Sequence, residues 1–121
     1  SQYEAVPGVT LNGELTLGEN IADLGGAKAA FRAYKISLAG EPSPIIDNYT
    51  GEQRFFIGTA QQDRVKFRKE IAAMRVATDP HSPARFRVDG VVINMKEFHQ
   101  SFSTQPGDKL YRSDDDIILI W

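Results

Sequence analysis

The most informative segment of this chain reads Gly18-Glu19-Asn20-Ile21-Ala22-Asp23-Leu24-Gly25-Gly26. Glu19 and Asp23 stand four residues apart in a stretch with helical periodicity, and side chains at that spacing share one face of a helix. Two rows of apolar and small residues continue along it: Leu24, Ala27, Phe31, Tyr34 and Leu38 in one, and Gly26, Ala30 and Ala33 in the other. Acidic side chains on a face that becomes buried need a cation or a hydrogen-bond donor beside them. The segment therefore predicts a long helix whose acidic turn meets a positive group.

The composition is that of one globular domain. The chain has 121 residues, of which 41% are hydrophobic and 25% charged, and we expect residues 1–121 to form a single unit. A formal net charge of −2 gives no electrostatic indication of a nucleic-acid or anionic-membrane partner. No apolar run is long enough for a membrane span. Cysteine is absent, which excludes disulfides and thiolate metal sites but leaves the compartment open.

The boundaries of the first helix follow from local signals. Thr16 is a candidate N-cap, with Glu19 at the capping-box position, and the periodicity runs to about Leu38 before Gly40. Residues 1–15 show little periodicity and are expected to be an irregular lead-in. The Gly25-Gly26 pair inside the helix indicates that another backbone packs closely there.

A second long helix is predicted after a proline-containing loop at 40–48. Thr50 is its candidate N-cap, with Gln53 completing a capping box. The helix is expected to reach about Ala77 and to be stopped by Asp79-Pro80-His81-Ser82-Pro83. The apolar face expected for it consists of Phe56, Ala60, Phe67, Ile71 and Met74.

The rest of the chain predicts short elements. Ser82-Pro83 is a plausible helix start, whereas Asp89-Gly90 is a hairpin signal, so 86–93 is open to both interpretations; we adopt the helix. Asn94, with Glu97, is expected to cap a short helix through Phe102. A turn at 106–108, a solvated acidic loop at 113–116 and an irregular apolar tail at 117–121 complete a mostly α fold.

The chemistry-bearing residues each have an ordinary alternative. An acidic pair at helical spacing is common on solvated surfaces; as chemistry, Glu19 is a candidate zinc ligand and Asp23 a group that holds a ligand histidine by its other N–H. His81 lies between prolines, where its N–H suits stabilisation of an oxyanion, and Arg87 suits a peptide carbonyl or carboxylate.

We interpret His99 as a surface or packing residue. Ser113-Asp114-Asp115-Asp116 lacks the spacing of a calcium loop.

Taken in order, these segments resemble the carboxyl-terminal end of neprilysin-type zinc endopeptidases, most nearly the bacterial oligopeptidase members. The resemblance rests on residues 18–26, on residues 79–87, on the segment around Phe98, on Pro106-Gly107-Asp108 and on Trp121. It covers essentially the whole chain and implies part of a larger thermolysin-like catalytic domain.

The resemblance implies a role for each of four residues. Glu19 matches a protein ligand of the single zinc ion, and Asp23 matches the aspartate that supports a zinc-bound histidine. His81 matches the histidine that donates to the tetrahedral intermediate, and Arg87, rather than Arg85, matches the arginine that holds the substrate backbone. Family members cleave short peptides at the amino side of apolar residues. Most of them are extracellular or periplasmic, and some bacterial ones are cytosolic. The resemblance therefore favours an extracytoplasmic location for this protein.

Two features depart from the family pattern. The His-Glu-x-x-His segment is missing, since the histidines are His81 and His99, so we expect weak or no zinc binding and no cleavage by this chain alone. Ile118 replaces the cysteine of animal members, which favours a bacterial, disulfide-free form.

The start at Ser1, without methionine, indicates a fragment, a processed product or an expressed segment. The expected partners are peptide substrate, the missing N-terminal part of the polypeptide, and a second copy docked on the Glu19/Gly26/Ala30 face. The alternative is a non-catalytic binding or accessory domain, in which Glu19 and Asp23 form salt bridges with this chain's own cations, such as Arg87.

Overall fold

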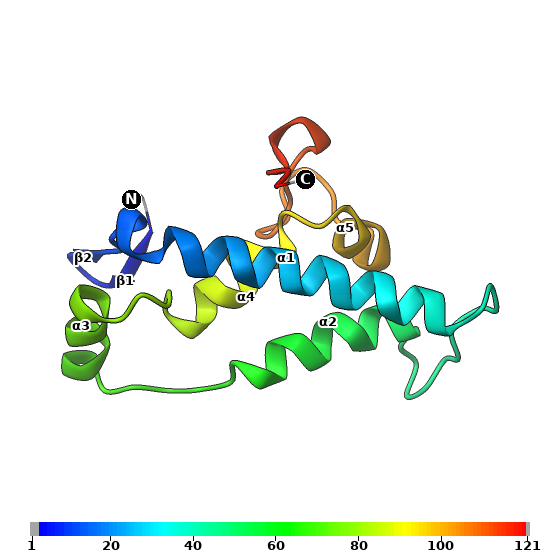
Figure 1. Cartoon of the computed structure of the whole chain (residues 1–121), viewed down its shortest axis with the longest axis horizontal. Helices are drawn as coiled ribbons and strands as arrows, with labels where there is room; N and C mark the ends of the chain where they lie inside the picture. Colours follow the sequence, from blue (N-terminus) through cyan, green and yellow to red (C-terminus); the bar gives the residue numbers. More distant parts are fainter. Residues whose placement is uncertain (1–2, 121) are drawn as a thin grey trace.

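The fold is an open, elongated arrangement of helices around one long helix. A computed structural model describes residues 3–120 and shows, within that range, five α-helices, one two-stranded sheet and one short 3₁₀ turn (Figure 1). The elements are β1 (Glu4–Val6), β2 (Val9–Thr10), α1 (Gly13–Ser37), α2 (Gly51–Gln62), α3 (Lys69–Thr78), α4 (Ala84–Val92), α5 (Lys96–Phe102) and η1 (Asp114–Asp116). The mostly α prediction is confirmed.

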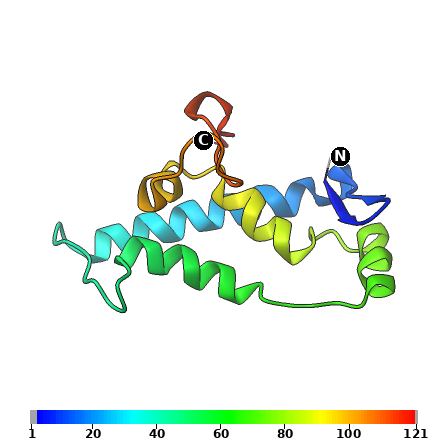
Figure 2. The same cartoon turned by 180° about the vertical axis from the view of Figure 1, so that it is seen from behind.

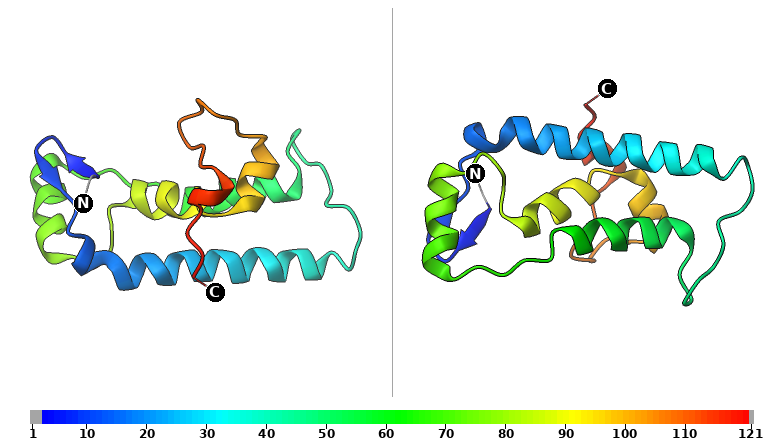
Figure 3. Two further views of the ribbon diagram at one scale, coloured as in Figure 1. Left: turned by 90° about the horizontal axis from the view of Figure 1, so that it is seen from above. Right: turned by 60° about the horizontal axis from the view of Figure 1, so that its bottom comes forward.

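The helices are laid out along α1. Helix α2 runs back beside it, the 63–68 connection continues to α3 at the end of the molecule that carries the hairpin, and α4 returns between α1 and α2 (Figure 1). The view from behind shows α4 lying against α1, and α3 contacts both strands of the hairpin (Figure 2). Seen from above, the final segment crosses over α1 (Figure 3). This return of α4 brings residues near 85 beside residues near 20.

The core is a cluster of apolar side chains between α1, α2 and α4. Its buried members are Leu24, Phe31, Phe56, Val91, Val92 and Met95. Phe31 stacks on Phe56 with ring centroids 5.4 Å apart and meets Phe55 edge-on at 5.1 Å. Such aromatic pairs add to the free energy gained by burial alone. The cluster fixes α1 relative to α2 and α4.

The N-cap of α1 is not the predicted residue, Thr16. Asn12 is the N-cap, because its Oδ1 accepts hydrogen bonds from the backbone N–H groups of Glu14 and Leu15 at 3.1 and 3.2 Å. Thr16 lies inside the helix, is buried, and donates to the carbonyl of Asn12 at 3.1 Å. The lead-in is also more regular than predicted: β1 and β2 pair antiparallel through a turn in which Gly8 has φ +79°. Ser1 and Gln2 lie outside the described residues.

The predicted second long helix is in fact two helices. The capping box of Thr50 and Gln53 is confirmed, but α2 ends at Gln62 and α3 begins at Lys69. Of the apolar face expected for it, Phe56 alone is buried; Ile71 and Met74 are exposed and Phe67 lies in the connection. The break has a tertiary cause, since it lets α3 turn and contact the hairpin.

Two further predicted caps are wrong although their helices are confirmed. Helix α4 covers the ambiguous segment as far as Val92, with Ile93 as its C-cap. Its N-cap is Pro83, while the Ser82 hydroxyl donates to Asn20 Oδ1 at 2.8 Å. The N-cap of α5 is Met95. Asn94 is buried and instead accepts from the Ile118 N–H at 2.9 Å, which holds the final segment against α4.

Side chains approach the backbone closely at Gly51, a glycine that the sequence did not single out. A Cβ on Gly26 would meet nothing within 4 Å, so no described segment packs there, although Gly25 is buried. A Cβ on Gly51 would lie 1.8 Å from Tyr34 Oη. Among residues 3–120, no helix combines the length and the apolar character required to cross a bilayer.

Candidate active site

Glu19 and Asp23 lie one turn apart on α1, and both are partly buried. They occupy the part of the helix that α4 and the 79–82 segment approach. Their side chains face His81 and Arg87, which those two segments carry. The sequence predicted that a positive group would lie against this acidic turn, and Arg87 is that group.

His81 is the group beside Glu19. Its Nε2 lies 3.3 Å from Glu19 Oε2, while its Nδ1 lies 2.9 Å from Asp79 Oδ1. The same Asp79 oxygen accepts the backbone N–H of His81 at 2.9 Å. Because a carboxylate accepts hydrogen bonds, the contact to Asp79 requires the proton on Nδ1. The ring is therefore held on one side and presents Nε2 on the other.

Asp79 is further stabilised as a carboxylate by its neighbours. Its pKa is lowered to about 2, first by the backbone N–H of His81, then by the His81 ring and by Arg75. Asp79 belongs to the predicted helix stop and to the 79–87 segment of the resemblance, but no role of its own was predicted for it. The signal that identifies it is the two-residue spacing to His81, at which an aspartate side chain reaches the following backbone N–H.

Arg87 is the group beside Asp23. It extends from α4 and donates from Nε and Nη2 to the two carboxylate oxygens of Asp23, at 2.8 and 2.7 Å. This bidentate geometry is the strongest form of an arginine–carboxylate pair. It raises the pKa of Arg87 further above its usual value, chiefly through the hydrogen bonds to Asp23. Arg85 instead pairs with Asp89 along α4 at 3.2 Å.

A partly buried hydrogen bond joins the two halves of the site. Asn20, between the two acids, accepts from the Ser82 hydroxyl at 2.8 Å, and Ser82 is buried. Asn20 also donates to the Thr16 hydroxyl at 3.3 Å. This contact between Asn20 and Ser82 was not predicted from the sequence, because a contact between residues 62 positions apart has no local signal.

The donor atoms fit one part of a zinc site. Among the described residues 3–120, no group of three or more histidine, cysteine, aspartate or glutamate side chains is arranged to hold a metal ion. Both oxygens of Asp23 are engaged by Arg87, which leaves the Glu19 carboxylate as the donor suited to a cation, with His81 beside it. A tetrahedral zinc site needs three protein ligands even when it is catalytic. These residues fit the contribution of one ligand and not a whole site.

His99 and the acidic residues 114–116 lie outside the candidate site. His99 Nε2 lies 3.0 Å from the carbonyl of Ile93 and its Nδ1 lies 2.6 Å from the Thr104 hydroxyl, which matches the packing role predicted for it. The acidic residues 114–116 are exposed on the 3₁₀ turn η1. Trp121 lies outside the described residues.

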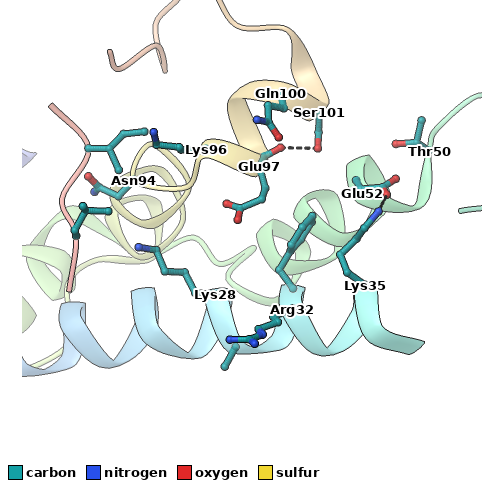
Figure 4. Close-up of a pocket in the computed structure, with 14 residues that line it drawn as sticks. Lys28, Arg32, Lys35, Thr50, Glu52, Asn94, Lys96, Glu97, Gln100 and Ser101 are labelled. Atoms are coloured by element: carbon teal, nitrogen blue, oxygen red, sulfur yellow. Dashed lines mark hydrogen bonds and ion pairs between the residues drawn. The ribbon is translucent and has the colours of Figure 1, made fainter. Parts of the chain in front are cut away.

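Two concavities border these elements. One, of about 490 Å³, lies beside the site and is lined by Asn20, Ile21, Ser82 and Phe86 among other residues. The larger, of about 970 Å³, lies between α1, the start of α2 and α5, and contains none of the four predicted site residues. Lys28 extends into it from α1 on the side that faces Asn94 and Glu97, and Arg32 lies along α1 (Figure 4). The largest groove is thus separate from the predicted chemistry.

Known proteins match this chain along almost its full length. The sequence model of Peptidase family M13 matches residues 1–118. Neprilysin-3 of Drosophila melanogaster is 43% identical over 107 residues, and endothelin-converting enzyme 1 of Cavia porcellus is 46% identical over 110 residues. These matches cover 85% and 88% of this chain but 14% of each relative.

Solved structures give the same result for the fold. The zinc metalloprotease Zmp1 of Mycobacterium tuberculosis is 46% identical, in an open state with a TM-score of 0.91 and in complex with an inhibitor with a TM-score of 0.92. Each match covers 95% of this chain and 18% of the Zmp1 chain. The five helices described here match the carboxyl-terminal part of that fold. The chain belongs to Peptidase family M13.

Proposed function

We propose that this chain forms the carboxyl-terminal part of the catalytic domain of a zinc metallo-endopeptidase that hydrolyses short peptides. One observation carries the proposal. Four polar residues predicted to share a site, Glu19, Asp23, His81 and Arg87, come from segments about 60 positions apart and meet in two direct contacts. Membership of Peptidase family M13 supports the reaction class.

In this proposal Glu19 is a zinc ligand, and the other ligands belong to polypeptide outside this chain. When bound, zinc polarises a carbonyl oxygen and lowers the pKa of a water molecule. With one carboxylate to offer, the isolated chain is expected to bind zinc weakly and to cleave no peptide.

His81 is proposed to stabilise the oxyanion of the tetrahedral intermediate. Asp79 contacts Nδ1, so Nε2 is the ring nitrogen directed away from Asp79; when the ring is protonated, Nε2–H donates to a negatively charged oxygen. In this chain Nε2 faces the Glu19 carboxylate at 3.3 Å. The His81 ring is thus oriented towards Glu19, the proposed metal ligand.

Arg87 is proposed to hold the substrate backbone, and Asp23 to orient a ligand histidine. Arg87 uses Nε and Nη2 for Asp23, which leaves Nη1 without a partner among the described residues. That nitrogen is available for a peptide carbonyl. Each Asp23 oxygen has a second lone pair for the N–H of an imidazole.

The alternative function is a non-catalytic domain that acts by contact. The pairing of Asp23 with Arg87 favours it, because that reading expects the acids to be neutralised by cations of the same chain. Under it, the longer protein neither retains zinc nor cleaves peptides.

The test compares variants of the full-length protein that contains this chain. Glu19→Gln is expected to reduce zinc affinity by more than about 100-fold, since changes even around the ligands cost 10- to 100-fold. His81→Ala is expected to lower kcat by about 100- to 1,000-fold with zinc retained, as does loss of an oxyanion donor elsewhere. Glu97→Gln, in the larger groove, is the matched control and changes neither quantity.

Zinc content is measured by metal analysis and activity on a short peptide with an apolar residue after the scissile bond. Full zinc content and activity in Glu19→Gln would exclude the ligand assignment. A wild-type protein that holds no zinc and cleaves nothing would establish the alternative.

A further inference from the structure

His81 stands at the end of a continuous series of polar contacts that begins on α3. The Arg75 guanidinium contacts Asp79 Oδ2, and Asp79 Oδ1 contacts His81 Nδ1 and accepts its backbone N–H, both at 2.9 Å. His81 Nε2 then faces Glu19 at 3.3 Å. Each oxygen of the Asp79 carboxylate therefore has its own donor.

Arg75 is itself held in place from two sides. The aromatic face of Phe67, from the 63–68 connection, lies under its guanidinium with the carbon 4.7 Å from the ring centroid. The Asp79 N–H donates to the Arg75 carbonyl at 2.8 Å, so the last turn of α3 joins the two residues through the backbone as well. A cation over an aromatic face is attracted to the ring, and this limits the orientations of the guanidinium.

The orientation of the His81 ring depends on where the Asp79 carboxylate points. The ring and the backbone N–H of His81 both contact Oδ1, so neither of them holds Oδ2. A donor on Oδ2 further restricts rotation of the carboxyl group, and Arg75 provides it. We propose that Arg75 is a positioning residue for His81 and acts through Asp79. This inference rests on the proposed function of His81.

The chain contains a matched pair that serves as a control. Arg85 and Asp89 on α4 have the same i, i+4 spacing, and the Arg85 guanidinium also lies over an aromatic ring, that of Phe86 at 5.7 Å. Asp89 contacts no histidine among the contacts described. Arg85→Gln removes an equivalent ion pair without disturbing Asp79.

The first measurement uses the zinc-free full-length protein labelled with ¹⁵N-histidine. Exchange of the His81 Nδ1 proton with solvent reports how often its bond to Asp79 opens, and His81→Gln assigns the resonance. We expect Arg75→Gln to accelerate this exchange about fivefold, the factor that corresponds to an exposed ion pair near the upper end of its usual strength. Arg75→Lys, which keeps the charge, restores most of the protection, and Arg85→Gln leaves it unchanged.

The second measurement is steady-state hydrolysis by the zinc-loaded protein. Arg75→Gln is expected to lower kcat about fivefold with KM unchanged, because the Arg75 side chain is placed behind His81 and not against substrate. Unchanged proton exchange in Arg75→Gln, or an equal acceleration in Arg85→Gln, would overturn the positioning role.

The two proposals fail in different ways. Should His81→Gln retain full kcat, the oxyanion role of His81 is wrong, while proton exchange in Arg75→Gln still decides whether Arg75 holds the ring. Accelerated exchange with unchanged kcat would show positioning of a ring that the reaction does not use, and so would reject Arg75 as a residue of the reaction.

Discussion

The Asp23–Arg87 pair is the best-defined polar contact between distant parts of this chain. Both side chains are partly buried, with 20% and 30% of their surface exposed, and two hydrogen bonds of 2.7 and 2.8 Å join them. The pair connects α1 to α4 on the side of the core, so it contributes to stability as well as to the proposed site.

Asp23→Asn tests that contribution. The amide removes the charge and one of the two acceptors, which leaves Arg87 incompletely satisfied, and hydrogen bonds to charged groups contribute about 1.5–3 kcal/mol. We expect the free energy of unfolding to fall by about that amount, measured by urea denaturation. Asp89→Asn, in the exposed pair with Arg85, is the control, with an expected loss of about 0.5 kcal/mol. Equal losses in the two variants would show that burial of the first pair adds nothing.

At the residue scale, the candidate site residues could be predicted from the sequence, but which of them contact one another could not. The spacing of Glu19 and Asp23 predicts a shared face because helix geometry is local. That Asp23 meets Arg87, 64 positions away, depends on the return of α4 along α1, which no local pattern encodes. Asp79 was within reach of local reasoning through its spacing to His81.

Helix termini show how local signals compete. Thr50 and Gln53 form the predicted box because both partners lie within one turn. Asn12 displaced Thr16 because it stands one turn earlier and captures two backbone N–H groups. The interruption at 63–68 contains no glycine or proline, and its cause is the packing of α3 on the hairpin. A tertiary break of this kind gives no sequence signal.

Gly51 at the start of α2 provides a test at the element scale. Gly51→Ala would place a Cβ 1.8 Å from Tyr34 Oη and 2.7 Å from Ser43 Cβ, so the junction of α1 and α2 must shift. Overpacking of this kind costs about 1–3 kcal/mol, and we expect the thermal midpoint to fall. Gly58→Ala, on the same helix with nothing within 4 Å, is expected to raise the stability by about 0.5–1 kcal/mol. A neutral Gly51→Ala would refute the tight junction.

The same junction has a predictable pH dependence. The pKa of Glu52 is lowered from 4.5 to about 2, first by the hydrogen bond from Lys35 and then by that from Ser43. Because the folded-state pKa is depressed, its stabilising contribution is complete above about pH 4.5 and disappears as the pH falls towards 2. Glu52→Gln is expected to unfold with a weaker dependence on pH over this window, followed by circular dichroism. Identical pH dependence in the two proteins would contradict the assignment.

At the scale of the whole molecule, one side of α1 has no described segment against it. Gly26 and Ala30, on the face that was predicted to meet a neighbour, are exposed, whereas Glu19 at the end of that face contacts His81. The chain spans 14% of the length of the curated relatives, and we propose that other parts of the longer polypeptide cover this face. A second copy of the chain is the alternative cover when it is isolated.

Sedimentation of the isolated chain tests whether this face associates. We expect concentration-dependent self-association, since apolar faces without a partner drive association. Ala30→Glu places a charge on the face and is expected to leave the chain monomeric, whereas Lys28→Glu, in the larger groove, serves as the charge control. A wild-type chain that stays monomeric at every concentration would exclude the homodimer.

The unbroken course of α1 has a consequence for communication across the molecule. Its 25 residues form a rod about 37 Å long at 1.5 Å per residue, with the acidic turn towards one end and Phe31 of the aromatic cluster beyond its middle. Because one helix carries both groups, we expect substitutions that loosen the aromatic packing to displace the acidic turn as well.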